Sequence, residues 1–272
     1  MMKKLNKFGL SSNVLKIIAV LFMIIDHIAE YLYPYIYPEM YYIFRSIGRM
    51  AMPLFVYLLI QGFFYTKNLK RYILRIFILA IVTQFIIFSL GYVNKSLYSN
   101  YNISVNEYFN VIFSYGLSLI IVSIIDRRKL FLKLNRGLNI FLGINILILI
   151  LYAFFRLNIE FKMQVPFLFI EIYLIEKAFI DSQNKLLLKS SNKLNVKNKL
   201  IYILLILISI FTSSFFVDYE IGNKYVILLS IILIFLYNGN RGKNSKTIQF
   251  TFYYFYPIHQ IVLYVMAMAF SK

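Results

Sequence analysis

The segment "IIDHIAEYLYPY", residues 24–35, places three ionisable side chains at the end of an apolar run that begins at Val14. Asp26 and Glu30 are four residues apart, and His27 and Glu30 are three apart, so in a helix all three share one side. An imidazole beside carboxylates is a combination used for general acid–base catalysis. The chain has only 2 histidines, so we treat this segment as the first candidate site.

The second histidine lies in "FYYFYPIHQ", residues 252–260. Tyr256 precedes His259 by three residues and therefore shares its helix face. Pro257 frees a backbone carbonyl, which a membrane helix tolerates where it is buried in protein or lines a cavity. His259 is thus either a hydrogen-bonded structural group or a second member of the same site.

A pair of arginines lies in "YYIFRSIGRMAMPLF", residues 41–55. Arg45 and Arg49 are four apart on one helix face, and their ends either reach the headgroups as anchors or pair with Asp26 or Glu30. We favour a buried charge network. Gly48 permits two helices to approach closely, and Pro53 predicts a kink in the same helix.

The composition requires a membrane around these residues. Of 272 residues, 61% are hydrophobic and 19% aromatic, with a mean hydropathy of +0.72, whereas globular proteins average roughly 45–50% apolar residues. Apolar stretches recur at the length of about 20 residues that crosses a bilayer. We therefore predict an all-α integral membrane protein, a single domain over residues 1–272 with nine helices. Their expected ranges are 14–33, 41–65, 72–93, 107–125, 137–155, 163–181, 199–217, 223–238 and 248–270.

The basic residues predict the orientation of the chain. With the N-terminus inside, 22 of the 29 Lys and Arg residues fall on inner segments and 7 on outer ones, as expected when cytoplasmic loops attract positive charge. The C-terminus is then outside, in a bacterial inner membrane. The net charge of +18 is explained by topology and lipid headgroups, so no nucleic-acid partner is expected. Zero cysteines exclude disulfides and thiol catalysis, and no metal site is predicted.

Helix depth relates the two histidines. His27 lies about 20 Å and His259 about 16 Å from the inner ends of their helices, at 1.5 Å per residue. A charged residue near mid-bilayer costs roughly 2.5–3.5 kcal/mol, and such residues mark functional sites when they face the bundle interior. The alternative is an interfacial pair that reaches the headgroups and has no function. We predict that both imidazoles converge in one enclosed chamber.

Three motifs together resemble the TraX family. They are "LKIIAVLFMIIDHIA", "RSIGRMAMPLFVYLLIQGFFYT" and "YNGNRGKNSK…FYYFYPIHQIVLY", which cover about residues 14–66 and 237–264. That family is named for a conjugal-transfer protein that acetylates the N-terminus of F-type pilin, and it looks distantly similar to heparan-alpha-glucosaminide N-acetyltransferase. One departure is Ala29, where a Gly commonly follows Asp-His-Ile. Residues 95–235 match only by hydropathy and length.

The resemblance implies a membrane acetyltransferase that uses cytosolic acetyl-CoA. The positions that it touches are Asp26, His27, Arg45, Gly48, Arg49, Pro53, Gly62, Asn238, Gly239, Arg241, Gly242, Tyr256, Pro257 and His259.

Acetyl transfer needs a base near the nucleophile and donors for the oxyanion. His27, oriented by Asp26, Glu30 or another helix, is the expected base, and His259 is the second candidate, as base or as an oxyanion donor with Tyr256.

The remaining expected roles concern binding. Arg45 and Arg49 would stabilise developing negative charge or bind an anionic acceptor, and Glu30 and Tyr256 would also contact the substrate. The basic loop "YNGNRGKNSK", with Asn238, Arg241 and Lys243, would hold the phosphates of CoA, although topology alone explains most of its charge. The acceptor is open between a peptide N-terminus, a surface sugar and a lipid head group. The alternatives to an enzyme are a transporter or flippase that uses the buried charges as a pathway, and a structural partner in a membrane assembly.

Overall fold

The computed structural model describes residues 9–97, 109–126, 136–188, 196–216, 224–242 and 246–270. Within these ranges the chain is helical, apart from connections and two isolated β-bridges. The α-helices are α1 (Ser12–Tyr31), α2 (Pro38–Gly48), α3 (Ala51–Tyr65), α4 (Leu69–Leu97), α5 (Val111–Ile125), α6 (Arg136–Arg156), α7 (Gln164–Leu188), α8 (Val196–Ser213), α9 (Ser230–Phe235) and α10 (Lys246–Phe270). Short 3₁₀ helices cover Tyr33–Tyr35, Ser214–Phe216 and Lys224–Leu229.

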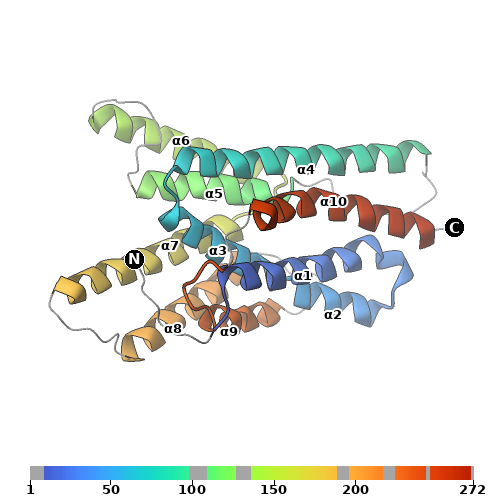
Figure 1. Cartoon of the computed structure of the whole chain (residues 1–272). Helices are drawn as coiled ribbons and strands as arrows, with labels where there is room; N and C mark the ends of the chain where they lie inside the picture. The colour runs from blue at the N-terminus through green and yellow to red at the C-terminus, as the bar shows by residue number, and fades with distance from the viewer. Residues whose placement is uncertain are drawn as a thin grey trace.

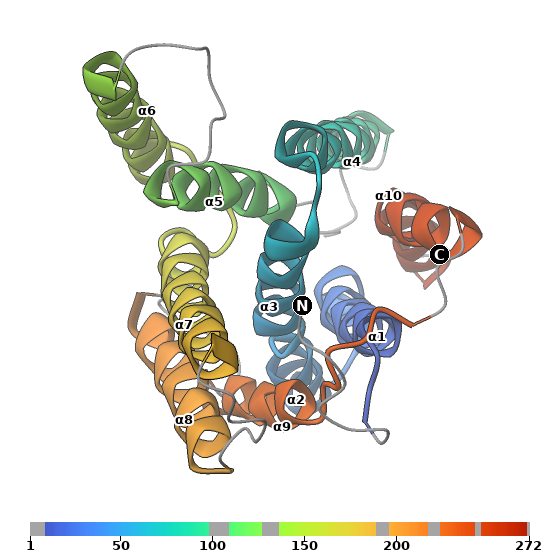
Figure 2. The same cartoon turned by 60° about the vertical axis from the view of Figure 1, so that its left-hand side comes forward.

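Helix α3 lies at the centre of the bundle. It packs against α1, α5, α7 and α9, and most of its side chains are buried. Helices α1 and α10, although far apart in the sequence, pack together and run in the same direction (Figures 1 and 2). Helix α6 lies at the edge, against α5. The order of packing therefore brings the two ends of the sequence to one side of the central helix.

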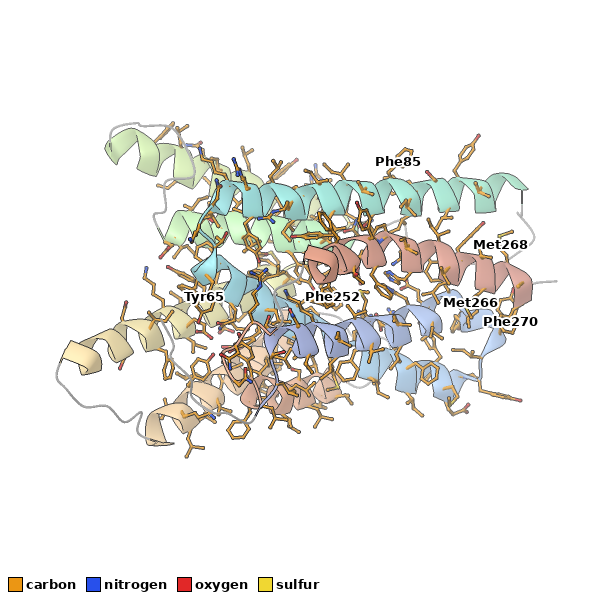
Figure 3. The ribbon with its side chains drawn as sticks, viewed as in Figure 1. Tyr65, Phe85, Phe252, Met266, Met268 and Phe270 are labelled. Carbon is orange, nitrogen blue, oxygen red and sulfur yellow. The ribbon has the colours of Figure 1, made fainter. Side chains whose placement is uncertain are left out.

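Three segments are long and apolar enough to cross a membrane. They are Ser12–Tyr31, Pro38–Tyr65 and Leu69–Val93. The faces that they turn outward are apolar, as expected for side chains in contact with lipid. Phe85 on α4 is 73% exposed and points away from the bundle, and Phe270 projects from the end of α10 (Figure 3). These features, within the described ranges, are those of a helical membrane protein.

The helix expected over 41–65 is divided in two. Helix α2 ends at Gly48, and Arg49 and Met50 form a turn before α3 begins. Pro53 therefore lies in the first turn of a new helix, where its missing N–H group leaves no hydrogen bond unmade. The helix is therefore interrupted at Arg49 and Met50 and not at Pro53, where the kink was predicted.

Other helix ends also differ from the expected ranges. The segment 223–238 contains a 3₁₀ helix followed by the short α9, not one continuous helix. Helix α5 begins at Val111 rather than at 107, because Asn110 caps it by accepting a hydrogen bond from the N–H group of Ile112 at 3.1 Å. A capping residue has extended backbone angles and so cannot lie inside the helix. Helix α7 continues to Leu188, seven residues past the expected end.

Candidate active site

A cavity of about 810 Å³ lies between α1, α3, α4, α5 and α10. Fifteen residues of α1 separate the first and last positions on its wall, which corresponds to about 22 Å at 1.5 Å per residue. Tyr65 and Phe252 lie near the end of the cavity where α1 begins (Figure 3). The wall positions on α1 recur every three or four residues, at Ser12, Lys16, Val20, Met23 and Asp26, and His27 follows directly after the last of them.

The two ends of the cavity carry different charges. Near the start of α1 the wall contains four basic side chains, Lys16, Lys67, Arg75 and Arg241. None of the four forms an ion pair with an acidic side chain of the described ranges. At the far end the wall contains two carboxylates and an imidazole, from Asp26, Glu160 and His27. The first end suits an anion, and the second end suits proton transfer.

The two histidines are in contact. His27 Nδ1 lies 2.8 Å from His259 Nε2, and the rings stack with centroids 4.9 Å apart. The side chains are 7% and 5% exposed, respectively. The predicted convergence of the two imidazoles is therefore confirmed, but only His27 lines the cavity, so the shared chamber is confirmed for one ring alone.

The hydrogen bonds assign a tautomer to each neutral ring. His259 Nδ1 lies 3.2 Å from the backbone oxygen of Phe255, which only accepts, so Nδ1 carries the hydrogen. His259 Nε2 then accepts a hydrogen bond from His27 Nδ1. His27 Nε2 is therefore unprotonated, and no described residue donates to it. This free nitrogen lies on the cavity side and can accept a proton.

Gln260 holds the histidine pair from the side. Its Nε2 lies 3.2 Å from His259 Nε2 and 3.4 Å from His27 Nδ1. The hydroxyl of Tyr31 donates to Gln260 Oε1 at 2.7 Å, which turns the amide nitrogen toward the rings. All four side chains are buried. The pair is thus oriented by hydrogen bonds between α1 and α10.

Asp26 is not the group that orients His27. Its Oδ2 pairs with Arg45 at 3.0 Å, and the same guanidinium nitrogen lies 3.4 Å from Glu30 Oε2. The predicted pairing of Arg45 with these carboxylates is confirmed. Of the three orienting groups left open for His27, the structure therefore shows another helix, α10, through His259 and Gln260. Asp26 points elsewhere because successive residues of a helix are about 100° apart.

Close helix approach makes the ion pair possible. A Cβ atom on Gly48 would lie 2.3 Å from Asp26 Cβ, so only glycine allows α2 to approach α1 at this point. The predicted role of Gly48 is confirmed. Arg45 is therefore only 8% exposed and lies in the interior beside its two carboxylate partners, Asp26 and Glu30.

Arg49 and Tyr256 occupy different surroundings. The Arg49 guanidinium lies over the ring of Phe161 at 4.8 Å and forms no ion pair with a described side chain. The predicted pairing of Arg49 with a carboxylate is thus not observed. Tyr256 lines the cavity, and its ring meets His259 edge-on with centroids 5.2 Å apart. Its hydroxyl forms no hydrogen bond within the described ranges, so it is available to a bound ligand.

The loop after α9 is tied to the segment before α1. Leu10 N donates to the oxygen of Leu236 at 2.8 Å, and Asn238 Nδ2 donates to the oxygen of Gly9 at 3.0 Å. Arg241 lines the cavity, whereas Asn238 does not. Lys243, the third expected phosphate ligand, lies outside the described residues.

Sequence reasoning missed Gln260 and Glu160. Gln260 directly follows His259, and this adjacency was a signal that the motif "PIHQ" offered. Glu160 lies in the connection between α6 and α7 and was assigned to an outer loop, with no feature of its neighbours that indicates burial. Within the described ranges no three His, Cys, Asp or Glu side chains lie close enough to hold a metal ion.

Comparison with known proteins agrees with the motifs. A family model described as "TraX protein" matches residues 11–267. A stretch of 70 residues is 33% identical to "Probable fimbrial assembly protein FimC, serogroup H1" of Dichelobacter nodosus. This stretch covers 26% of the present chain and 28% of that protein, so the similarity spans less than a third of the relative. No solved structure matches the chain.

Proposed function

The chain belongs to the TraX family, and from this premise we propose that it is a membrane-embedded acetyltransferase. It moves an acetyl group from cytosolic acetyl-CoA to an acceptor at the outer side of the membrane. One observation carries the proposal: His27, whose Nε2 is left unprotonated by the hydrogen bonds of the histidine pair, lines a cavity whose opposite end is basic. A base for the attacking group and a basic site for the phosphates of the donor are two parts that transfer from CoA uses.

The orientation proposed for the chain is multi-pass in the bacterial inner membrane, with the basic end of the cavity on the cytoplasmic side. The excess of Lys and Arg on the predicted inner segments supports it. So does the parallel course of α1 and α10, since a first and a last helix that run the same way require an odd number of crossings. Acetyl-CoA then enters from the cytoplasm.

The donor fits the length of the cavity. Phosphates of CoA would bind at Lys16, Lys67, Arg75 and Arg241, which supply charge-assisted donors. Lys16 also lies over the ring of Phe252, at 5.7 Å from its centroid. From Lys16 to His27 the helix rises about 16 Å, a distance that the extended pantetheine arm spans. The thioester carbonyl would thus meet His27.

In the transfer step the acceptor attacks the thioester carbonyl. His27 Nε2 takes a proton from the attacking group while His27 Nδ1 keeps its hydrogen bond to His259. The hydroxyl of Tyr256 is available to stabilise the oxyanion. As the C–S bond breaks, His27 returns the proton to the CoA thiolate. No metal enters this step.

The acceptor is proposed to be an amine. Beside His27 the cavity wall carries the carboxyl groups of Asp26 and Glu160, whereas the guanidiniums of Arg45 and Arg49 do not line it. Asp26 Oδ1 is buried and has no hydrogen-bond partner within the described ranges. Carboxylate oxygens on the wall favour an ammonium, which donates charge-assisted hydrogen bonds to them, over a neutral sugar hydroxyl. The fimbrial name of the similar protein supports a pilin-like peptide N-terminus, with a surface sugar as the second candidate.

The direct test uses purified protein in lipid nanodiscs with acetyl-labelled acetyl-CoA. An acetyltransferase binds the donor, labels a peptide that has a free N-terminus, and releases stoichiometric CoA thiol. A transporter or flippase that uses the charge network would release no thiol, and a structural partner would not bind the donor. Absence of both donor binding and thiol release would sink the proposed function.

The basic end of the cavity predicts an effect on donor binding alone. Lys16→Gln/Arg241→Gln should raise the KM for acetyl-CoA about tenfold or more, because each charge-assisted contact contributes roughly 1.5–3 kcal/mol. The value of kcat should stay within about twofold, since ground state and transition state lose the same contact. Lys70→Gln/Arg71→Gln removes two exposed charges that do not line the cavity and is the matched control. Equal KM changes in both variants would contradict this donor site.

The hydrogen bond from Tyr31 to Gln260 predicts a smaller effect on the chemical step. Tyr31→Phe should lower kcat about fivefold, since a typical hydrogen bond contributes about 1 kcal/mol and the Gln260 amide is then free to rotate. The KM for acetyl-CoA should not change. Tyr33→Phe, at a tyrosine that is 56% exposed, is the control for the loss of a hydroxyl. Full activity of the Tyr31 variant would show that Gln260 does not orient the pair.

A further inference from the structure

The transfer step assigned to His27 leaves the carboxylate of Glu160 without a role. Glu160 lies in the connection Leu157–Met163, outside the helices, yet it forms part of the cavity wall at the same end as His27. The connection is fastened to the start of α5. Glu160 N donates to the oxygen of Phe109 at 2.9 Å, and Ser114 Oγ donates to the oxygen of Glu160 at 3.0 Å. Its position is therefore fixed by the fold.

The backbone beside Glu160 is strained. Phe161 and Lys162 have φ values of 61° and 36°, in the left-handed region that favours glycine. Such conformations are unfavourable for residues other than glycine and cluster at functional sites. This turn points Glu160 into the cavity while the ring of Phe161 covers Arg49. The strained turn therefore indicates that the position of Glu160 in the cavity wall has a functional role.

The two oxygens of the Glu160 carboxylate differ. Oε2 accepts a hydrogen bond from the N–H group of Val111, at the start of α5, at 3.2 Å. Oε1 forms no hydrogen bond with any described residue. Because the side chain lines the cavity, this oxygen is the one presented to a ligand. One oxygen anchored and one open is the geometry of a group that accepts a proton from a bound molecule.

The surroundings of Glu160 suit a group that takes up a proton near neutral pH. Burial raises the pKa of its carboxyl to about 7; the charge of Glu30 adds to this, and that of Arg49 opposes it. A base works best when its pKa lies near the operating pH. The titratable and charged groups that face it from the neighbouring elements are Asp26 and Glu30 on α1, Arg45 and Arg49 from α2 and its end, Tyr115 on α5 and Tyr256 on α10.

We propose that Glu160 is a second catalytic residue, which removes the proton that an ammonium acceptor must lose before it can attack. The proposal rests on the acetyltransferase function proposed above. Glu160 Oε1 takes one proton from R–NH₃⁺, and the resulting R–NH₂ attacks the thioester. His27 Nε2 takes the second proton, the C–N bond forms, the C–S bond breaks, and His27 protonates the thiolate. Glu160 then releases its proton to water, so that ammonium and thioester give amide, thiol and one proton.

The test compares two acceptors in nanodiscs at pH 7. One is a short apolar peptide with a free α-amino group, whose pKa is roughly 7.7–8.0; the other is its aminooxy analogue, which is neutral at this pH. Glu160→Gln keeps an oxygen for the Val111 N–H group and should lower kcat/KM for the α-amino peptide about tenfold or more. With the aminooxy peptide the loss should be less than about twofold, because that acceptor has no proton to give up before attack. Glu39→Gln, at an exposed glutamate of α2, is the matched control.

The pH dependence is a second readout. In the wild type, transfer to the α-amino peptide should rise with pH through about 7, as the carboxyl of Glu160 ionises. The Glu160→Gln variant should lose this rise and recover only as the acceptor itself deprotonates, so its deficit should shrink several-fold between about pH 7 and pH 9. Glu160→Asp serves if the glutamine variant does not fold, and should show the same selectivity for the α-amino peptide.

Equal losses with both acceptors would overturn the proposal and leave Glu160 as a structural residue. Transfer to hydroxyl acceptors but to no amine would overturn it as well. Both results leave the acetyltransferase function intact, because wild-type protein still consumes acetyl-CoA. Failure of the acetyltransferase function itself is a separate result, in which wild-type protein releases no CoA thiol with any acceptor.

Discussion

His27→Ala should lower acetyl transfer by roughly 10²–10⁴-fold, the usual contribution of a general base. The variant loses the nitrogen that faces the cavity, while His259, Gln260 and the basic end of the cavity stay in place. The dissociation constant for acetyl-CoA, measured by equilibrium binding, should therefore stay within about twofold. Rates are measured as CoA thiol released in the presence of a peptide acceptor.

A chemical rescue separates a lost base from a damaged fold. Truncation to alanine leaves room for an imidazole molecule at the cavity wall, so added imidazole should restore part of the activity of His27→Ala. His259→Ala leaves His27 in the cavity but removes the acceptor of its Nδ1 hydrogen bond, and its loss should be smaller, about tenfold. Transfer by His27→Ala at a rate near that of the wild type would remove the base from the mechanism.

The position of the histidine pair was only partly predictable from the sequence. Counting residues from the inner ends of their helices places His27 and His259 at similar depths, and in the structure each is 13 to 15 residues into its helix. Depth follows from helix geometry and a membrane of fixed thickness. Contact between the rings does not, because it depends on which faces of α1 and α10 pack together. The hydropathy of lipid-facing helices is nearly uniform and carries little information on those faces.

The charge network, too, was only partly predictable from the sequence. Arg45 was expected to pair with Asp26 or Glu30 because an unpaired arginine inside a membrane is costly, and it pairs with both. Arg49, four residues on, was expected to do the same and instead lies over Phe161. Its surroundings come from a connection with left-handed backbone angles at non-glycine residues, and such a conformation has no sequence signature. Glu160 was missed for the same reason.

Arg45→Met should destabilise the protein by about 3–5 kcal/mol, the usual cost of breaking a buried ion pair. The change leaves two carboxylates, of Asp26 and Glu30, in the interior without the guanidinium that lies 3.0 and 3.4 Å from them. Methionine fills much of the arginine volume, so the loss reports charge more than packing. The measurement is the free energy of unfolding in mixed micelles, from denaturant titration of the purified variant.

The triple variant Arg45→Met/Asp26→Asn/Glu30→Gln tests whether the unpaired carboxylates cause the loss of stability in Arg45→Met. Replacing a whole buried ion pair by uncharged side chains of similar volume leaves no unpaired charge behind, and the remaining amides cost less than a buried charge. Most of the 3–5 kcal/mol lost in the single variant, an order-of-magnitude figure, should then be recovered. Arg71→Met, at an exposed arginine of α4, should change stability by less than about 0.5 kcal/mol. If the triple variant is as unstable as Arg45→Met, the arginine acts through packing along its side chain. In that case the close approach of α1 and α2 at Gly48 determines where Asp26 and Glu30 lie in the wild type, since a Cβ atom on Gly48 would lie 2.3 Å from Asp26 Cβ. The attraction of the two carboxylates to Arg45 would then contribute little to stability.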